Sequence, residues 1–290
     1  MKKSTLSEIY IIIASVLWGM IGISVTALTG MGLSRMDVVF VRALTAFAAL
    51  ALYLLITDRQ AFRVRLKDLW CFFGTGVISL MLFNLCYFSA MKHTSLAIAA
   101  VLLYTAPAFV VVISAFVFRE KITSVKIISL VMMFAGCVLV TGIFDEEAKF
   151  SLSGILFGLG SGLGYAMYSI FSRFALNRGY SSASISLYTF LFAAFGSAFL
   201  TDYGNIADIF CAEGVFYSLF IGVLCCTLPY IFYTKGMEHT ENGKASTLAM
   251  TEPLIATVIS VAFFGDVLTG WKIAGILIMF AAIGFMNLKK

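Results

Sequence analysis

Two ionisable side chains lie inside otherwise apolar stretches of this sequence and are the first candidates for chemistry. Glu252 directly precedes Pro253 in a stretch of apolar and small residues, and Arg42 lies near the start of another apolar stretch. A charged residue at the centre of a bilayer costs about 2.5–3.5 kcal/mol on insertion scales, so such residues are usually functional. Glu252 is therefore our candidate for binding a substrate amine or for taking up and releasing a proton. A protonated glutamate that hydrogen-bonds to a neighbouring helix is the structural alternative.

Arg42 allows two interpretations. Its planar guanidinium suits a carboxylate or a phosphate, but a long side chain near a helix end can also extend its head to the membrane surface. The same stretch offers no second cation to complete an anion clamp, so we assign Arg42 a structural role. Pro107 and Pro253 are also assigned structural roles, because proline lacks the N–H that a helix interior needs and leaves a carbonyl free for another partner.

Uncharged polar and aromatic residues add further candidates for contacts to a substrate. Asn84 lies in an apolar stretch, where a hydrogen bond between helices, worth about 0.6–2 kcal/mol, is its expected role and substrate contact the alternative. Rings with a polar group usually mark the ends of membrane helices, so those in the middle of apolar stretches could line a cavity or simply pack. These central aromatic residues are Trp18, Tyr104, Tyr165, Tyr168, Tyr230 and Tyr233.

Several kinds of site are not predicted. Gly154, Gly158 and Gly162 recur at four-residue spacing, which favours a close helix-packing face and not a phosphate loop. The Gly-rich Lys-Ser/Thr motif that binds nucleotide phosphates does not occur, and the six cysteines are not spaced as metal ligands are. No cofactor and no metal are therefore expected. His93 and His239 fall on opposite sides of the predicted membrane and cannot share a metal. Without a nucleophile and base at matched depth we do not predict an enzyme.

Composition places these residues in a membrane. The chain has 290 residues, of which 61% are hydrophobic and only 12% charged, whereas soluble domains are about 25% charged. An all-α integral membrane protein is expected, with lipid and a small molecule as partners, no nucleic acid, and either a monomer or a homodimer. About 20 apolar residues span a bilayer. Ten segments meet this length: 8–28, 38–56, 69–91, 96–118, 125–143, 152–176, 181–200, 215–237, 245–264 and 272–288.

The distribution of basic residues predicts the orientation of these ten helices. Connections that face the cytoplasm carry an excess of Lys and Arg. One side holds fifteen: Lys2, Lys3, Arg59, Arg63, Arg65, Lys67, Arg119, Lys121, Lys126, Arg173, Arg178, Lys235, Lys244, Lys289 and Lys290. The other side holds four, namely Arg35, Lys92, Lys149 and Lys272, together with the acidic run 145–147. Both termini are therefore predicted to lie in the cytoplasm, and the protein is predicted to reside in the cytoplasmic membrane.

The second half of the chain repeats the first. A shift of 146 residues aligns Pro107 with Pro253 and Glu120 with Asp266, and gives 19 identities in 55 pairs between residues 82–136 and 228–282. Glu120 and Asp266 end their helices, where capping or local pairing is expected rather than substrate binding. The predicted domains are residues 1–146 and 147–290, with five helices each. An odd number of helices inverts the second copy, an architecture that recurs in secondary transporters.

At this point the sequence resembles the EamA-type drug/metabolite transporter superfamily. The resemblance rests on Leu17-Trp18-Gly19, on Arg42, on the run from Pro107 to Thr123, and on the run from Glu252 to Thr269. It implies ten helices in two inverted five-helix repeats and the export of small metabolites. Asp266, where such families usually carry Glu, and Gly164-Tyr165-Ala166, which replaces a Trp, depart from the pattern.

The expected function is secondary active transport of an amino acid or an amphipathic metabolite or drug by alternating access. Export is the expected direction. A facilitative small-solute channel is the first alternative and an intramembrane enzyme the second.

Overall fold

The computed structural model describes residues 3–143 and 151–288, and every regular element in these two ranges is helical. The acidic run 145–147 and Lys2, Lys149, Lys289 and Lys290, which contribute to the predicted orientation, lie outside the described residues. Seven helices are long and apolar enough to cross a membrane: Ser4–Gly30, Arg35–Thr57, Leu66–His93, Leu96–Val117, Leu152–Asn177, Ala212–Met237 and Asn242–Phe264. Three shorter apolar helices cover Ser124–Val140, Ser182–Ala198 and Gly270–Met286.

Five of the seven long helices are interrupted and consist of more than one element, whereas Arg35–Thr57 and Leu152–Asn177 are continuous. In chain order the first half contains α1 (Lys3–Gly19), α2 (Ile21–Gly30), α3 (Arg35–Thr57), α4 (Leu69–Phe73), α5 (Leu82–His93), α6 (Leu96–Leu103), α7 (Ala106–Val117) and α8 (Ser124–Val140). The second half contains α9 (Leu152–Asn177), α10 (Ser182–Ala198), α11 (Tyr203–Ile206), α12 (Ala212–Leu219), α13 (Leu228–Met237), α14 (Asn242–Ala249), α15 (Glu252–Phe264) and α16 (Gly270–Leu288).

The interruptions within the long helices recur at positions that the shift of 146 residues relates. Between α6 and α7 the helix breaks just before Pro107, and between α14 and α15 it breaks just before Pro253. A proline ring clashes with the carbonyl four residues earlier, which explains both breaks. Wide π-helical turns at Gly74–Met81 and Phe220–Thr227 connect α4 to α5 and α12 to α13. Pro229 follows the second wide turn, and its ring lies against the carbonyl of Cys225 within that turn, whereas no proline lies in or directly after the first. The two halves therefore share interruptions even where only one half carries a proline.

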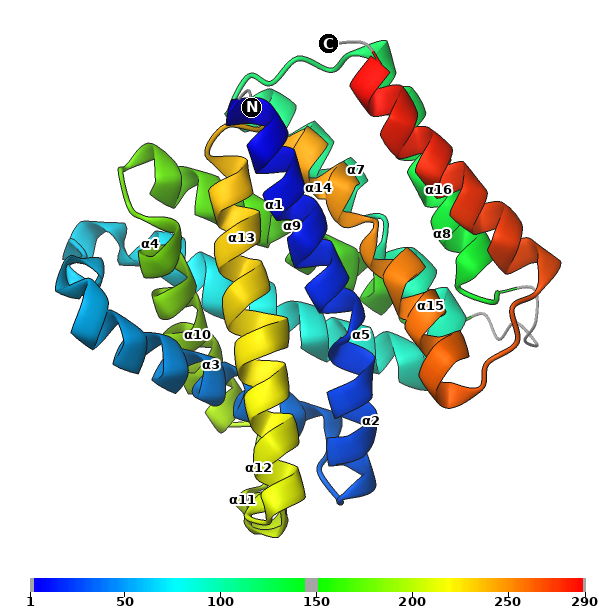
Figure 1. Ribbon diagram of the computed structural model, residues 1–290. Helices are drawn as coiled ribbons and strands as arrows, with labels where there is room; N and C mark the ends of the chain where they lie inside the picture. The colour runs from blue at the N-terminus through cyan, green and yellow to red at the C-terminus, as the bar shows by residue number, and fades with distance from the viewer. Residues whose placement is uncertain (1–2, 144–150, 289–290) are drawn as a thin grey trace.

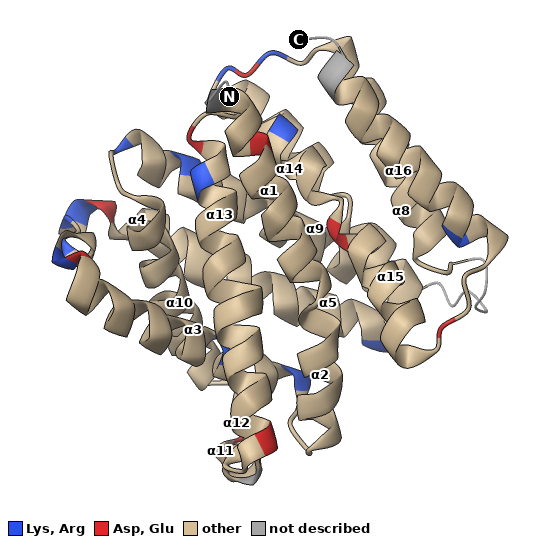
Figure 2. Cartoon of the chain, in the orientation of Figure 1, with Lys and Arg blue, Asp and Glu red and all other residues tan. Residues whose placement is uncertain are grey.

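The helices pack into a bundle (Figure 1), and its buried core includes Trp18, Tyr168 and Tyr230. α9 packs against α5, α6 and α7, α1 packs along α13, and α3 packs along α10. α8 and α16 form a pair at one side of the bundle. Charged residues gather mainly near helix ends and in connections, and the middles of the helices are almost free of them (Figure 2). This distribution is that of a multi-pass membrane protein.

Glycines permit the closest helix contacts in the bundle. A Cβ added to Gly158 would lie 2.4 Å from a methyl carbon of Leu102, and one added to Gly162 would lie 2.6 Å from the Thr105 hydroxyl. Both glycines therefore face the segment where α6 ends, and α9 approaches it without room for a side chain. Such small residues allow close backbone approach between membrane helices.

Candidate functional site

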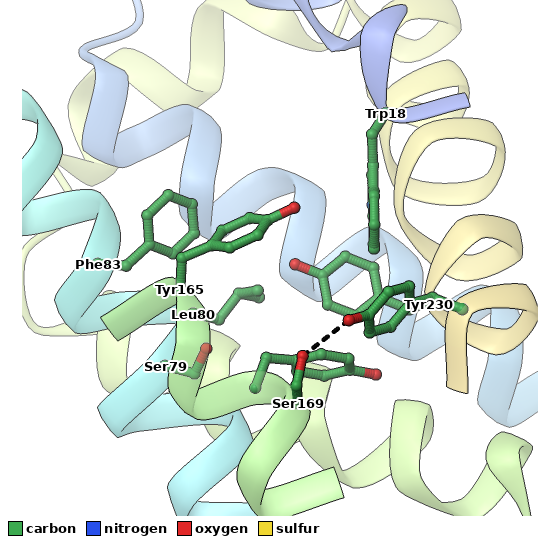
Figure 3. A pocket seen from close by; sticks show the side chains of 9 residues that line it. Trp18, Ser79, Leu80, Phe83, Tyr165, Ser169 and Tyr230 are labelled. Carbon is green, nitrogen blue, oxygen red and sulfur yellow. Dashed lines mark hydrogen bonds between the residues drawn. The ribbon is translucent and has the colours of Figure 1, made fainter. Parts of the chain in front are cut away.

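Aromatic residues from four helices, α1, α5, α9 and α13, surround a small cavity at the centre of the bundle (Figure 3). Trp18 comes from the end of α1, Tyr165 and Tyr168 from α9, and Tyr230 from α13. The remaining lining residues are Ser79, Leu80, Phe83, Ser169 and Tyr233. The free space is about 10 Å³, roughly the room that one water molecule needs. In this conformation the cavity holds no space for a metabolite.

The rings of the cavity wall hold one another in fixed orientations. The ring centroids of Trp18 and Tyr230 are 5.3 Å apart with an interplanar angle of 80°, and those of Tyr168 and Tyr230 are 4.9 Å apart at 81°. Edge-to-face pairs of this kind contribute about 0.5–1.5 kcal/mol beyond the burial of their area. The Tyr168 hydroxyl lies 2.8 Å from the Thr234 hydroxyl, so its position is fixed as well.

Ser169 of α9 adds a hydroxyl group to the cavity wall. The hydroxyl of Tyr233 lies 2.8 Å from that of Ser169 (Figure 3). Ser169 follows Tyr165 by four residues, so both lie on one face of α9. The cavity therefore has an apolar aromatic surface with hydroxyl groups already paired within the protein.

Glu252 approaches the cavity through Tyr165. It is the first residue of α15, directly after the break in the helix. The Tyr165 hydroxyl donates a hydrogen bond to Glu252 Oε2 over 3.2 Å, and both side chains keep part of their surface exposed. A carboxylate at the start of a helix is stabilised by the unpaired backbone N–H groups there. The break before Pro253 thus places a carboxyl group beside the aromatic cavity.

Arg42 and Asn84 form a buried pair that is hydrogen-bonded to the backbone of the cavity-lining residue Leu80. Arg42 Nη2 donates to Asn84 Oδ1 over 3.0 Å, and Asn84 Nδ2 donates to the Leu80 carbonyl over 2.6 Å. Only 8% of Arg42 is exposed, so its head does not extend to the protein surface. Its Nε is buried and has no hydrogen-bond partner among the described residues. A buried, unpaired donor on a cation is costly, and a bound anion would satisfy it.

The structure brings together most of the residues that the sequence singled out, with one exception. Trp18, Tyr165, Tyr168 and Tyr230 line the cavity, and Glu252 and the Arg42–Asn84 pair adjoin it through Tyr165 and Leu80. The exception is Tyr104, which lies at the break between α6 and α7 and packs against a separate buried cluster that includes Met133 and Met250.

Sequence reasoning did not select four of the lining residues, Ser79, Leu80, Phe83 and Ser169. Two of them carry a signal that could have been used. Phe83 directly precedes Asn84, and Ser169 shares a helical face with Tyr165. Ser79 and Leu80 lie in a π-helical turn, where the usual helical spacing does not tell which face a residue occupies.

A larger cleft of about 310 Å³ lies away from this core. Arg63, Arg65, Arg178 and Tyr180 are among its lining residues, and it is formed by the connections after α3 and α9. Arg63 and Arg65 are exposed, so the cleft has the character of a charged surface between helix ends. Within residues 3–143 and 151–288, no group of three or more His, Cys, Asp or Glu side chains could hold a metal ion.

Comparison with known proteins identifies the family. The sequence pattern of the EamA-like transporter family matches residues 5–142 and 152–288. An uncharacterized transporter of Archaeoglobus fulgidus is 27% identical over 272 residues, which cover 92% of this chain and 91% of that protein. The uncharacterized transporter YwfM of Bacillus subtilis is 25% identical over 281 residues, which cover 96% and 92%.

A solved crystal structure has the same fold. It superimposes with a TM-score of 0.80 at 17% identity and covers 97% of this chain and 96% of its own. The resemblance found in the sequence is confirmed by the family match over both halves of the chain. This protein belongs to the EamA-like transporter family.

Proposed function

We propose that the protein is a secondary transporter that moves an amino acid or an amphipathic metabolite across the cytoplasmic membrane by alternating access. One observation carries the proposal: a buried cation with an unpaired donor, Arg42, and a carboxylate, Glu252, adjoin the same aromatic cavity. A zwitterion could place its carboxylate on Arg42 and its amine near Glu252, with its apolar part against Trp18 and Tyr230. Export is the proposed direction.

Helix lengths support a topology with ten membrane crossings, which would put both termini on one side; the basic residues make that side the cytoplasm in our proposal. The seven long helices are joined by three shorter ones, of which α8 and α10 have 17 residues each and α16 has 19. A span requires roughly 17–25 residues, so the shorter helices also reach across. The breaks that recur after 146 residues support two five-helix repeats, 1–146 and 147–290, in inverted orientation.

The small volume of the cavity supports a carrier over a channel. A facilitative channel needs a continuous path, whereas the cavity has room for about one water molecule. The bundle must therefore rearrange to admit a metabolite. Some exposed surface remains beside the cavity, on Glu252, Tyr165 and Tyr104.

Counterflow in proteoliposomes tests this proposal. Vesicles preloaded with unlabelled amino acids or nucleosides are exposed to the labelled compound, with wild type compared to Glu252→Gln and to the control Glu238→Gln. Glu238 bonds to Ser182 at a helix end, far along α13 from the cavity. We expect wild type and the control to accumulate label only when solute is present on the other side, and the response to a pH gradient to be lost in Glu252→Gln.

Three outcomes would contradict parts of the proposal. Rapid flux that needs no solute on the opposite side would indicate a channel. Absence of flux for every amino acid would remove that substrate class. Unchanged counterflow and pH response in Glu252→Gln would return this glutamate to a structural role.

A further inference from the structure

Two connections that the shift of 146 residues relates have the same internal structure. We call residues 114–126 the first corner and residues 260–272 the second corner. In the first corner, the backbone N–H of Glu120 donates to the Ser114 carbonyl over 3.2 Å. In the second, the N–H of Asp266 donates to the Ser260 carbonyl over 3.3 Å. The backbone that carries the carboxylate therefore has the same hydrogen bond in both corners.

The lysine of each corner donates to an equivalent backbone carbonyl, but Lys126 also forms an ion pair with Glu241 directly before α14, where the other half of the repeat has Ser95. Lys126 Nζ donates to the Lys121 carbonyl over 2.9 Å, and Lys272 Nζ donates to the Val267 carbonyl over 3.0 Å. The distance from the lysine to the carboxylate of its own corner differs, however. It is 3.7 Å in the first corner and 2.8 Å in the second. The carboxylate of the first corner has moved away from its lysine.

The difference arises because Glu120 binds another helix. Its two carboxylate oxygens accept hydrogen bonds from the backbone N–H groups of Asn242, over 2.7 Å, and Gly243, over 3.1 Å. These are the first two residues of α14. A carboxylate at the start of a helix gains both charge-assisted hydrogen bonds and the favourable helix dipole. Glu120 therefore ties the first half of the chain to the second.

Asp266 makes no such connection. Among the described residues its partners are Ser260, Val267 and Lys272, all in its own corner. The positions equivalent to Asn242 and Gly243 are Leu96 and Ala97, at the start of α6. Lys272 is the largest influence that lowers the pKa of the Asp266 carboxyl below its ordinary value, so this group is charged and able to accept hydrogen bonds.

Helix packing also differs between the two ends of the bundle, and the end that Glu120 holds is the more closely packed. α14 packs along α7 and also touches α8 and α9, whereas α6 has no comparable contact with α15 or α16. At the start of α14, a Cβ on Gly243 would lie 3.0 Å from Val111 of α7, so the two backbones are close. The bundle is thus closed at the end where α14 begins.

Further hydrogen bonds reinforce this closed end. Arg173 of α9 donates to the Asn242 side chain over 2.7 Å and to the Thr240 carbonyl. The Asn242 side chain in turn donates to the Ser114 hydroxyl over 3.2 Å. At the other end the two halves are joined by the Ser151 hydroxyl, which donates to the His93 carbonyl over 2.9 Å. Residues 24–30, the part of the first half that corresponds to the region around Arg173, contain no Arg or Lys.

We propose that Glu120 and Asp266 are alternating latches, each closing one end of the bundle by binding the start of a helix from the other half. In the conformation described here Glu120 is engaged and Asp266 is held by Lys272. In the opposite conformation Asp266 would accept from the N–H groups of Leu96 and Ala97, and Glu120 would return to Lys126. This inference rests on the proposed alternating access and names the residues that perform it.

Distances between paired spin labels test the latches without any transported solute. One pair replaces exposed residues beside the first latch, Lys121→Cys with His239→Cys, and the other replaces their repeat equivalents, Val267→Cys with His93→Cys. Cys211→Ser, whose hydroxyl oxygen can replace the Sγ that accepts from the Gly214 N–H, and Cys86→Ala remove the accessible native thiols. Distances are measured by pulsed electron resonance in lipid nanodiscs for each variant.

In wild type, the 121/239 pair should show one short, dominant distance. Glu120→Gln, which preserves the side-chain volume, should raise the ratio of long to short distances about tenfold, the equivalent of about 1.4 kcal/mol. The 93/267 pair should shorten in the same variant. Adding Asp266→Ala should abolish that shortening, and Glu238→Gln should change neither pair.

Two results would overturn the proposal. One is an unchanged 121/239 distance in both Glu120→Gln and Glu120→Ala. The other is a longer 121/239 distance without shortening of the 93/267 pair, which would indicate local fraying. If the labels exchange as expected but counterflow is absent for every solute, the latches stand and the proposed substrate class fails.

Discussion

At the scale of single residues, Arg42 shows what the sequence could not reveal. Its partner Asn84 lies 42 residues away in the chain, and no local pattern predicts that contact. The sequence favoured a structural role because it showed one cation and no clamp. The structure adds a buried Nε without a partner among the described residues, which raises Arg42 to a proposed ligand for an anionic group.

Arg42→Lys should weaken substrate binding while the protein still folds. Lysine keeps the positive charge but loses the planar set of donors that can bind a carboxylate in two places. A hydrogen bond to a charged group contributes about 1.5–3 kcal/mol, so KM for counterflow should rise about tenfold or more. Arg59→Lys is the control, since Arg59 is exposed and its Nε donates to the backbone of Leu55. An equal KM in the two variants would show that Arg42 has no role in binding.

At the scale of helices, much of the architecture follows from the sequence. Apolar length located the spanning segments because the bilayer core requires it, and Pro107 and Pro253 marked two of the breaks. Pro229 marks the π-helical turn at Phe220–Thr227, because its ring clashes with the carbonyl four residues earlier, but no proline lies in or directly after the turn at Gly74–Met81. The sequence also predicted capping or local pairing for Glu120 and Asp266. Asp266 does pair locally, and Glu120 caps a helix of the other half because α14 is folded against α7.

Glycines of α9 provide a test of helix packing with an internal control. Gly162→Ala should destabilise the protein by about 1–3 kcal/mol, because an added methyl group overpacks a close helix contact. Its Cβ would lie 2.6 Å from the Thr105 hydroxyl and 2.9 Å from the Leu102 carbonyl. Gly160→Ala should be neutral or stabilising, since its nearest neighbour is Cys86 Sγ at 3.4 Å.

Thermal unfolding in detergent distinguishes the two glycine variants. The expected result is a lower Tm for Gly162→Ala than for wild type and an unchanged or higher Tm for Gly160→Ala. Equal values for the two would show that α9 can move away from α6 at no cost.

At the scale of the whole molecule, the proposed orientation can be tested with a native side chain. Cys211 is exposed and directly precedes α12, in a connection without Lys or Arg. The distribution of basic residues places it outside the cell. A membrane-impermeant maleimide should therefore label intact cells, and Cys211→Ser should remove most of that label.

A cysteine on the other proposed side supplies the comparison for this labelling. Arg63→Cys in the Cys211→Ser background should react only after the cells are permeabilised, because Arg63 is exposed in a connection assigned to the cytoplasm. The reverse pattern would mean that the whole bundle is inserted the other way, with export and import exchanged.

The contact between α8 and α16 has a consequence for how such a chain could have originated. These helices occupy equivalent positions in the two halves, and Met133 and its equivalent Met279 are both fully buried in one cluster between them. Gly136 and Gly275 bring the two backbones together. An interface in which a surface meets its own equivalent is the kind that joins identical subunits around a two-fold axis. A half-length ancestor could therefore have associated with a second copy of itself through this helix before gene fusion joined the two in one chain.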